Sequence, residues 1–157
     1  MVEEAKTDEY ELTPEEMLLV TKHLGDNPIV DKKFKANVIL TREQADKRRQ
    51  LIQEVEYDFQ LALRKGDYYL GNAVINFYLK EMPSNDTDLF VNSQALAIAD
   101  LMINDRQMAA TPESFQNQVI PLRPSDVVQG WNTVQMRYLT PYNKNRVGLH
   151  TFIDSSD

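Results

Sequence analysis

The stretch Val55–Glu81, VEYDFQLALRKGDYYLGNAVINFYLKE, decides the fold because apolar residues recur at every second position on both sides of a short turn. In its first half the alternating apolar residues are Val55, Tyr57, Phe59, Leu61 and Leu63. Lys65-Gly66-Asp67 supplies the turn, and in the second half Ala73, Ile75, Phe77 and Leu79 fall on one face. We therefore expect a β-hairpin whose first strand is half buried.

Further short apolar runs follow the hairpin, separated by turn signals. We expect strands over residues 89–94, 96–104, 118–122, 131–142 and 147–153. In the second of these the apolar members are Ile98, Leu101 and Ile103, and Pro121 argues for an edge strand or a strand end. Because no helical period interrupts these runs, the sequence predicts a mainly β domain, an antiparallel β-sandwich or saddle-like sheet.

A helical N-terminal arm is predicted to precede this domain. Thr13 and Glu16 form a Thr-x-x-Glu capping box and Pro14 suits the first helical position, so we expect a helix over about 14–24. Its apolar face includes Met17, Val20 and Leu24, which we predict to contact a partner; packing on the chain's own sheet is the alternative.

A second capping box, formed by Thr41 and Gln44, predicts another helix that begins after Thr41. We interpret residues 26–40, between the two helices, as an extended linker. The expected division is an arm over 1–39 and a β-domain over 40–157.

Charge and composition narrow the class of protein. The 157 residues contain no cysteine, which excludes disulfides and thiolate chemistry. Net charge is −6 over residues 1–16, +4 over 17–53 and −5 over 54–157. The overall sign disfavours nucleic-acid binding, and a basic belt could instead meet an acidic partner. Without an apolar span or a secretory leader, we expect an intracellular protein that does not enter a membrane, in the cytoplasm or in a cytoskeletal or organelle-associated complex.

Residues that could carry chemistry are few. His23 falls in the last turn of the expected arm helix, where a cation is favourable, and His150 lies too far along the chain to pair with it at metal-ligand spacing. The loop Asn85–Asp88 lacks the length and glycine of a calcium loop. We expect no catalytic residue, metal site or cofactor. Binding of a small ligand or glycan by Tyr68, Tyr69 and Tyr142 stays open as an alternative.

From Leu40 onward the order of features resembles the N-terminal β-domain of the aminopeptidase N family of zinc metallopeptidases. The stretches that carry the resemblance are LTREQADKRRQLIQEVEYDFQLAL, YLGNAVINFYLKE, DLFVNSQ, IADLMIND and GWNTVQMRYLTPYNKNRVGLHTFIDSSD. They cover about 118 of the 157 residues. The sequence departs from the family at Asn104-Asp105-Arg106, where an Asn-Gly turn is usual, and in its helical arm.

The resemblance implies a scaffold rather than an active site. None of the family's zinc ligands, its catalytic base or its substrate clamp maps onto a position of this sequence. In that family one face of the β-domain's sheet is buried against the catalytic domain. A chain without the catalytic domain would therefore expose this face. We therefore expect a non-catalytic structural subunit that docks in a larger protein assembly; the alternative is one fragment of a split zinc aminopeptidase whose catalytic domain is on another chain.

Overall fold

The computed structural model describes residues 9–35 and 40–143. Its elements are α1 (Pro14–Leu24), β1 (Ile29–Val30), α2 (Arg42–Leu51), β2 (Ile52–Ala62), β3 (Tyr68–Leu79), β4 (Phe90–Asn92), β5 (Ala97–Ile103), β6 (Arg106–Gln107), the 3-10 turn η1 (Pro112–Ser114), β7 (Val119–Pro121) and β8 (Gly130–Pro141). Both helices and the strands predicted from the hairpin to residue 142 are confirmed in place. The predicted strand 147–153, with His150, lies outside the described residues.

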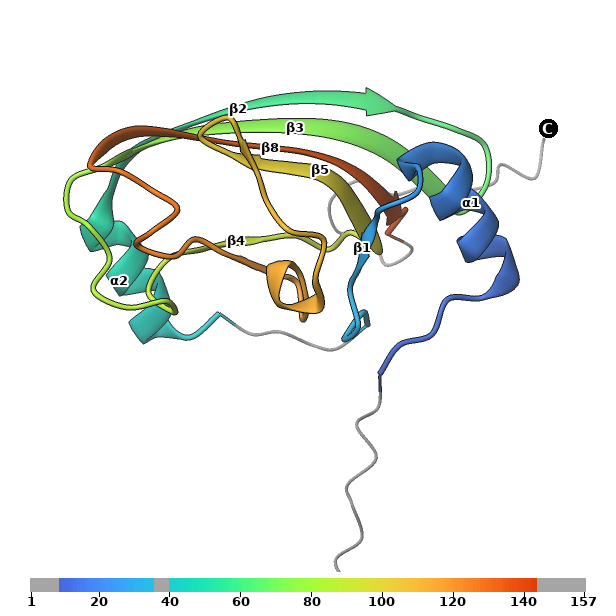
Figure 1. Cartoon of the computed structure of the whole chain (residues 1–157), viewed down its shortest axis with the longest axis horizontal. Helices are drawn as coiled ribbons and strands as arrows, with labels where there is room; N and C mark the ends of the chain where they lie inside the picture. Colours follow the sequence, from blue (N-terminus) through green and yellow to red (C-terminus); the bar gives the residue numbers. More distant parts are fainter. Residues whose placement is uncertain (1–8, 36–39, 144–157) are drawn as a thin grey trace, which may run out of the picture.

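The main sheet is antiparallel and runs in the order β1-β5-β8-β3-β2, with β6 paired to β5. The predicted hairpin is confirmed, with Tyr57 opposite Ile75 in its register. β8 inserts between β5 and β3, pairing with β3 from Gly130 to Pro141. As a result β2 forms one edge of the sheet and β1 the other (Figure 1).

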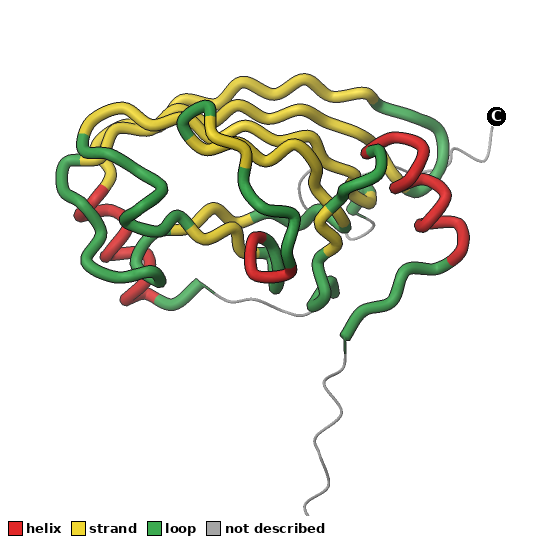
Figure 2. Tube along the Cα trace, viewed as in Figure 1, coloured by secondary structure: helices red, strands yellow, loops and turns green. Residues whose placement is uncertain are grey.

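A second, smaller layer lies beneath the arch of the main sheet (Figure 2). It contains the two-stranded sheet of β4 and β7 together with loops and η1. Helix α2 lies at one end of the arch and α1 at the other (Figure 1). The fold is thus mainly β and antiparallel, as expected, but a β-sandwich is not confirmed because each strand of the second sheet has three residues.

The main core fills the space between the arch and the second layer. We call the arch's lower side its inner face; β3 contributes Ala73, Ile75, Phe77 and Leu79 to it, all buried. On β5, Ile98, Leu101 and Ile103 reach the same core although their spacing is not two. A bulge between Ala99 and Met102, with Asp100 at a φ of 52°, restores the alternation.

A second core lies on the outer face, under α1. Val20 and Leu24 pack there against Leu96, Ala97, Ala99 and Leu139. Arg137 of β8 fastens the helix by donating to the carbonyl oxygen of His23 at 3.0 Å and to the Asp100 carboxylate at 2.6 Å. The predicted capping box of Thr13 and Glu16 is formed.

Glu16 is the buried acid of this outer core. Its carboxylate accepts hydrogen bonds from the Tyr10 hydroxyl, from the Tyr68 hydroxyl at 2.6 Å and from the Thr13 amide at 3.0 Å. Burial alone would raise the pKa of Glu16, but these hydrogen bonds outweigh it and lower the pKa below its usual value. Burial and the bond to Glu16 raise the pKa of Tyr10 to about 12.

The interpretation of residues 26–40 as a linker is wrong for Ile29–Val30, which pair with β5 as β1. The next residue, Asp31, is fully buried. Its Oδ1 accepts from the Lys33 amide at 2.9 Å and the Asn117 amide at 2.6 Å, and its Oδ2 from the Gln118 amide at 2.9 Å. Asp31 therefore ties the N-terminal segment to a second-layer turn in which Asn117 and Gln118 have positive φ.

Candidate docking groove

The apolar row of β2 is the feature that departs most from the prediction. The strand is confirmed, but it is not half buried: its alternating apolar residues Val55, Tyr57, Phe59, Leu61 and the following Leu63 are 38 to 62% exposed. Alternation identified the apolar face correctly, yet nothing in the described part of the chain covers it. The physical reason is that the second layer ends short of this edge, over β3 and β8, whose inner residues are the buried ones.

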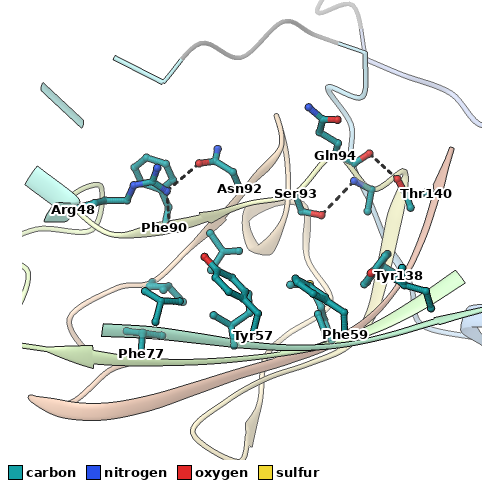
Figure 3. A pocket seen from close by; sticks show the side chains of 18 of the residues that line it. Arg48, Tyr57, Phe59, Phe77, Phe90, Asn92, Ser93, Gln94, Tyr138 and Thr140 are labelled. Atoms are coloured by element: carbon teal, nitrogen blue, oxygen red, sulfur yellow. Dashed lines mark hydrogen bonds between the residues drawn. The ribbon is translucent and has the colours of Figure 1, made fainter. Parts of the chain in front are cut away.

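The exposed row opens into a groove of about 690 Å³ on the inner face. One wall is the sheet, through β2, β3 and β8; the other is the second layer from Leu89 to Ala95, with Leu122. Figure 3 shows Tyr57 and Phe59 projecting from the sheet toward the segment that carries Phe90 and Asn92. Their rings stack on each other with centroids 5.6 Å apart. The groove is therefore lined mostly by apolar and aromatic side chains.

Tyr138 shapes the floor of the groove and requires a glycine opposite it. Gly71 of β3 pairs with Tyr138 of β8, and a Cβ built on Gly71 would lie 2.3 Å from the Tyr138 Cζ atom. The ring thus lies across the space that a side chain at residue 71 would occupy. Burial and the neighbouring Tyr69 raise the pKa of Tyr138.

Polar groups gather along the second-layer side of the groove. Arg48 of α2 lies over the Phe90 ring, 4.7 Å from its centroid, and donates to Asn92 Oδ1 at 3.1 Å. At the other end, Thr140 donates to the Gln94 carbonyl oxygen at 3.3 Å (Figure 3). Arg48 is the one charged residue among those that line the groove in the described ranges.

The outer face of β2 has the opposite character. Glu54, Glu56 and Asp58 alternate with the apolar row and are exposed; we call them the acidic row. No salt bridge involves them within residues 9–35 and 40–143. One strand at the edge of the sheet therefore presents an apolar side and an anionic side.

The tyrosines considered for ligand binding serve different purposes. The Tyr68 hydroxyl binds Glu16, and the Tyr142 hydroxyl donates to the Arg64 carbonyl oxygen at 2.8 Å, which fastens the hairpin turn. Tyr69 lines the groove and packs on Tyr142 with ring centroids 4.9 Å apart. Of the three, Tyr69 alone belongs to the groove.

The arm residues predicted to contact a partner are divided by the structure. Val20 and Leu24 are 2% and 3% exposed because they pack on the chain's own sheet. Met17 is 56% exposed and its neighbour Leu18 is 73% exposed. Contact with a partner through the arm stays a prediction, and Met17 is the member of the set placed to make it.

The other candidates for chemistry have structural partners. His23 contacts Arg64, and burial, followed by Arg64 and Lys22, lowers the pKa of His23. Asp88 accepts from the Ser84 hydroxyl at 2.8 Å, which lowers the pKa of Asp88. Among the described residues, no group of three or more histidines and acids is arranged to hold a metal ion. No helix in that same part of the chain is long and apolar enough to cross a bilayer.

Neither a search of protein-family models nor a search of curated proteins finds a match to this chain. The resemblance to the aminopeptidase N family thus rests on the quoted stretches alone.

The resemblance led us to expect an exposed sheet face, but the residues that line the groove were not identified from the sequence. Its lining comes from α2, three strands of the main sheet and the 89–95 segment, which are brought together by the topology. The available signal was local: an edge strand with an uninterrupted apolar row and no lysine or proline between residues 52 and 62.

Proposed function

We propose that this chain is a non-catalytic interaction subunit, an aminopeptidase N-terminal-type β-domain that docks within a larger protein assembly inside the cell. The observation that carries the proposal is the exposed apolar row of β2, continuous with the groove beneath it. Large uncovered apolar patches usually mark interfaces.

The shape of the second layer supports the same proposal. β4 and β7 cover the inner face of the sheet in part, and the groove lies along the uncovered part. A partner seated in the groove would bury Tyr57 and Phe59 and complete a second layer. In this proposal, the partner supplies the part of the second layer that this chain lacks.

The test is affinity capture of the full chain from its native extract, comparing the parent with a Tyr57→Thr/Phe59→Thr variant. Both positions are more than half exposed and threonine favours strands, so the variant should fold. The matched control is Trp131→Thr, an aromatic residue that is 49% exposed on the other face of the sheet. We expect the groove variant to lose the complex and the control to keep it.

The same eluate distinguishes the alternative, a split zinc aminopeptidase. Chelator-sensitive aminopeptidase activity in the parent complex would identify the partner as a catalytic chain. An inactive complex that depends on Tyr57 and Phe59 is the result expected for a structural subunit. Equal recovery of partners by parent and groove variant would refute docking through this surface.

A further inference from the structure

The β2 edge has backbone groups available for another strand. β2 pairs with β3 in continuous register from Glu54 to Ala62, and within the described ranges no strand pairs with its other side. In an antiparallel pair, alternate residues direct both their N–H and C=O groups to the same side. Half of the β2 residues therefore direct these groups away from β3, where an added strand can bind them.

The two faces of β2 dictate what such a strand must carry. Side chains of directly opposed residues lie on the same face of a sheet. Every second residue of the added strand would therefore lie beside the inner row, which includes Tyr57 and Phe59, and would face the groove. The residues between would lie beside the acidic row of Glu54, Glu56 and Asp58. The first set must be apolar and the second basic.

We propose that the groove binds a partner segment by β-augmentation, as an extended strand in which apolar and basic residues alternate. This inference rests on the proposed function and specifies the chemistry of its partner. The apolar residues enter the groove beside Tyr57 and Phe59, and the basic ones pair with Glu56 and Asp58. Main-chain hydrogen bonds to β2 align the segment, and the alternation selects it.

A second copy of the chain fits this edge less well. Antiparallel pairing of two β2 strands over their full length, centred on Tyr57, would place Glu56 of each copy opposite Asp58 of the other. Directly opposed like charges destabilise a strand pair. The acidic row therefore favours a basic partner over self-association.

The experiment uses the full chain and a labelled synthetic peptide of alternating lysine and valine, as long as the regular part of β2, residues 54–62. Two control peptides keep the length: one has glutamate in place of lysine, and the other groups the same lysines and valines into two blocks. Fluorescence anisotropy measures affinity, and amide hydrogen exchange locates the bound peptide. We expect binding of the alternating basic peptide alone, with slowed exchange in β2.

A charge-reversed variant tests the acidic row. Glu56→Lys/Asp58→Lys should weaken the lysine peptide by about tenfold or more and should permit the glutamate peptide to bind, because each attractive cross-strand pair becomes repulsive. The matched control, Asp86→Lys/Glu113→Lys, changes the net charge equally at one exposed loop residue and one exposed residue of η1, and it should leave both affinities unchanged. Equal affinity for the alternating and block peptides would overturn the inference, as would binding without protection of β2 or dimerisation of the free chain through this edge.

Failure of this inference is distinct from failure of the proposed function. If Tyr57→Thr/Phe59→Thr abolishes the native complex while Glu56→Lys/Asp58→Lys leaves it intact, the groove is an interface but its occupant is not a basic strand. If neither variant affects the native complex, the docking surface itself is wrong.

Discussion

Replacing Asp31 by alanine should loosen the N-terminal segment from the second layer and destabilise the whole chain. The carboxylate is fully buried and accepts three backbone amides, from Lys33, Asn117 and Gln118. Alanine leaves all three without this acceptor. Each buried amide left without an acceptor costs about 1–3 kcal/mol, so for three such amides we expect a loss of about 4 kcal/mol.

Urea unfolding followed by circular dichroism measures the loss. With an m-value of about 2 kcal/mol/M, the midpoint should fall by about 2 M. In Asp31→Asn the side-chain oxygen can still accept hydrogen bonds, but the side-chain NH₂ group faces a backbone amide that is also a donor. We therefore expect this variant to lose about half as much stability as Asp31→Ala. The control is Asp46→Ala, which removes an exposed ion pair with Arg42 at 3.9 Å and should change stability by less than about 0.5 kcal/mol.

The reasoning is refuted if Asp31→Ala unfolds within about 1 kcal/mol of the parent, or if it matches the Asp46→Ala control. Amide exchange adds a local measurement. Asn117 and Gln118, which are held at positive φ beside Asp31, should exchange faster in Asp31→Ala, and the β3 amides far from this site should respond only to the change in global stability.

Three further changes test other parts of the fold. Gly71→Ala should cost about 1–3 kcal/mol because its Cβ meets the Tyr138 ring, and adding Tyr138→Leu should recover part of the loss; an unchanged unfolding midpoint for the single variant would contradict the packing described. Because the pKa of Glu16 is lowered in the folded chain, the ionised carboxylate stabilises the fold at pH values above the unfolded-state pKa. This contribution to the free energy of unfolding is lost as the pH falls through the lower folded-state pKa. The stability difference between the parent and Glu16→Gln should therefore shrink from pH 6 toward pH 3, and a difference independent of pH would exclude this carboxylate as the cause. Val20→Ala should lower the free energy of unfolding in urea by about 1–3 kcal/mol because Val20 is buried. Met17→Ser, at an exposed position, should change this free energy by less than about 0.5 kcal/mol. Equal losses in the two variants would show that the arm helix packs differently.

The sequence predicted those elements whose signals come from residues close together in the chain. A period of two over many residues identifies the β2–β3 hairpin, and capping residues identify both helices, because these elements are defined by neighbours in sequence. β1 spans two residues, too short for any period, and it forms because β5 supplies its partner. The sequence shows a three-residue step from Ile98 to Leu101 where a strand would have a step of two. The structure explains this step by the bulge at Asp100, whose φ is positive.

The candidate site was harder to predict because coverage is a tertiary property. The alternation of apolar and polar residues in β2 indicates which side chains share a face of the sheet. It does not indicate whether a second layer covers that face. Asp31 shows the same limit: an acid in an apparent linker has no local signal of burial, and its three partners include two residues of a distant turn. Both features depend on which segments the topology brings together.

The position of β8 in the sheet has a consequence for the order of folding during synthesis. β8 separates β5 from β3, so the sheet cannot close until residues 130–141 have left the ribosome. The β2–β3 hairpin is complete long before then and waits with the apolar sides of both strands in water. Contacts that join distant segments form slowly, and strand edges exposed in the meantime are prone to aggregate.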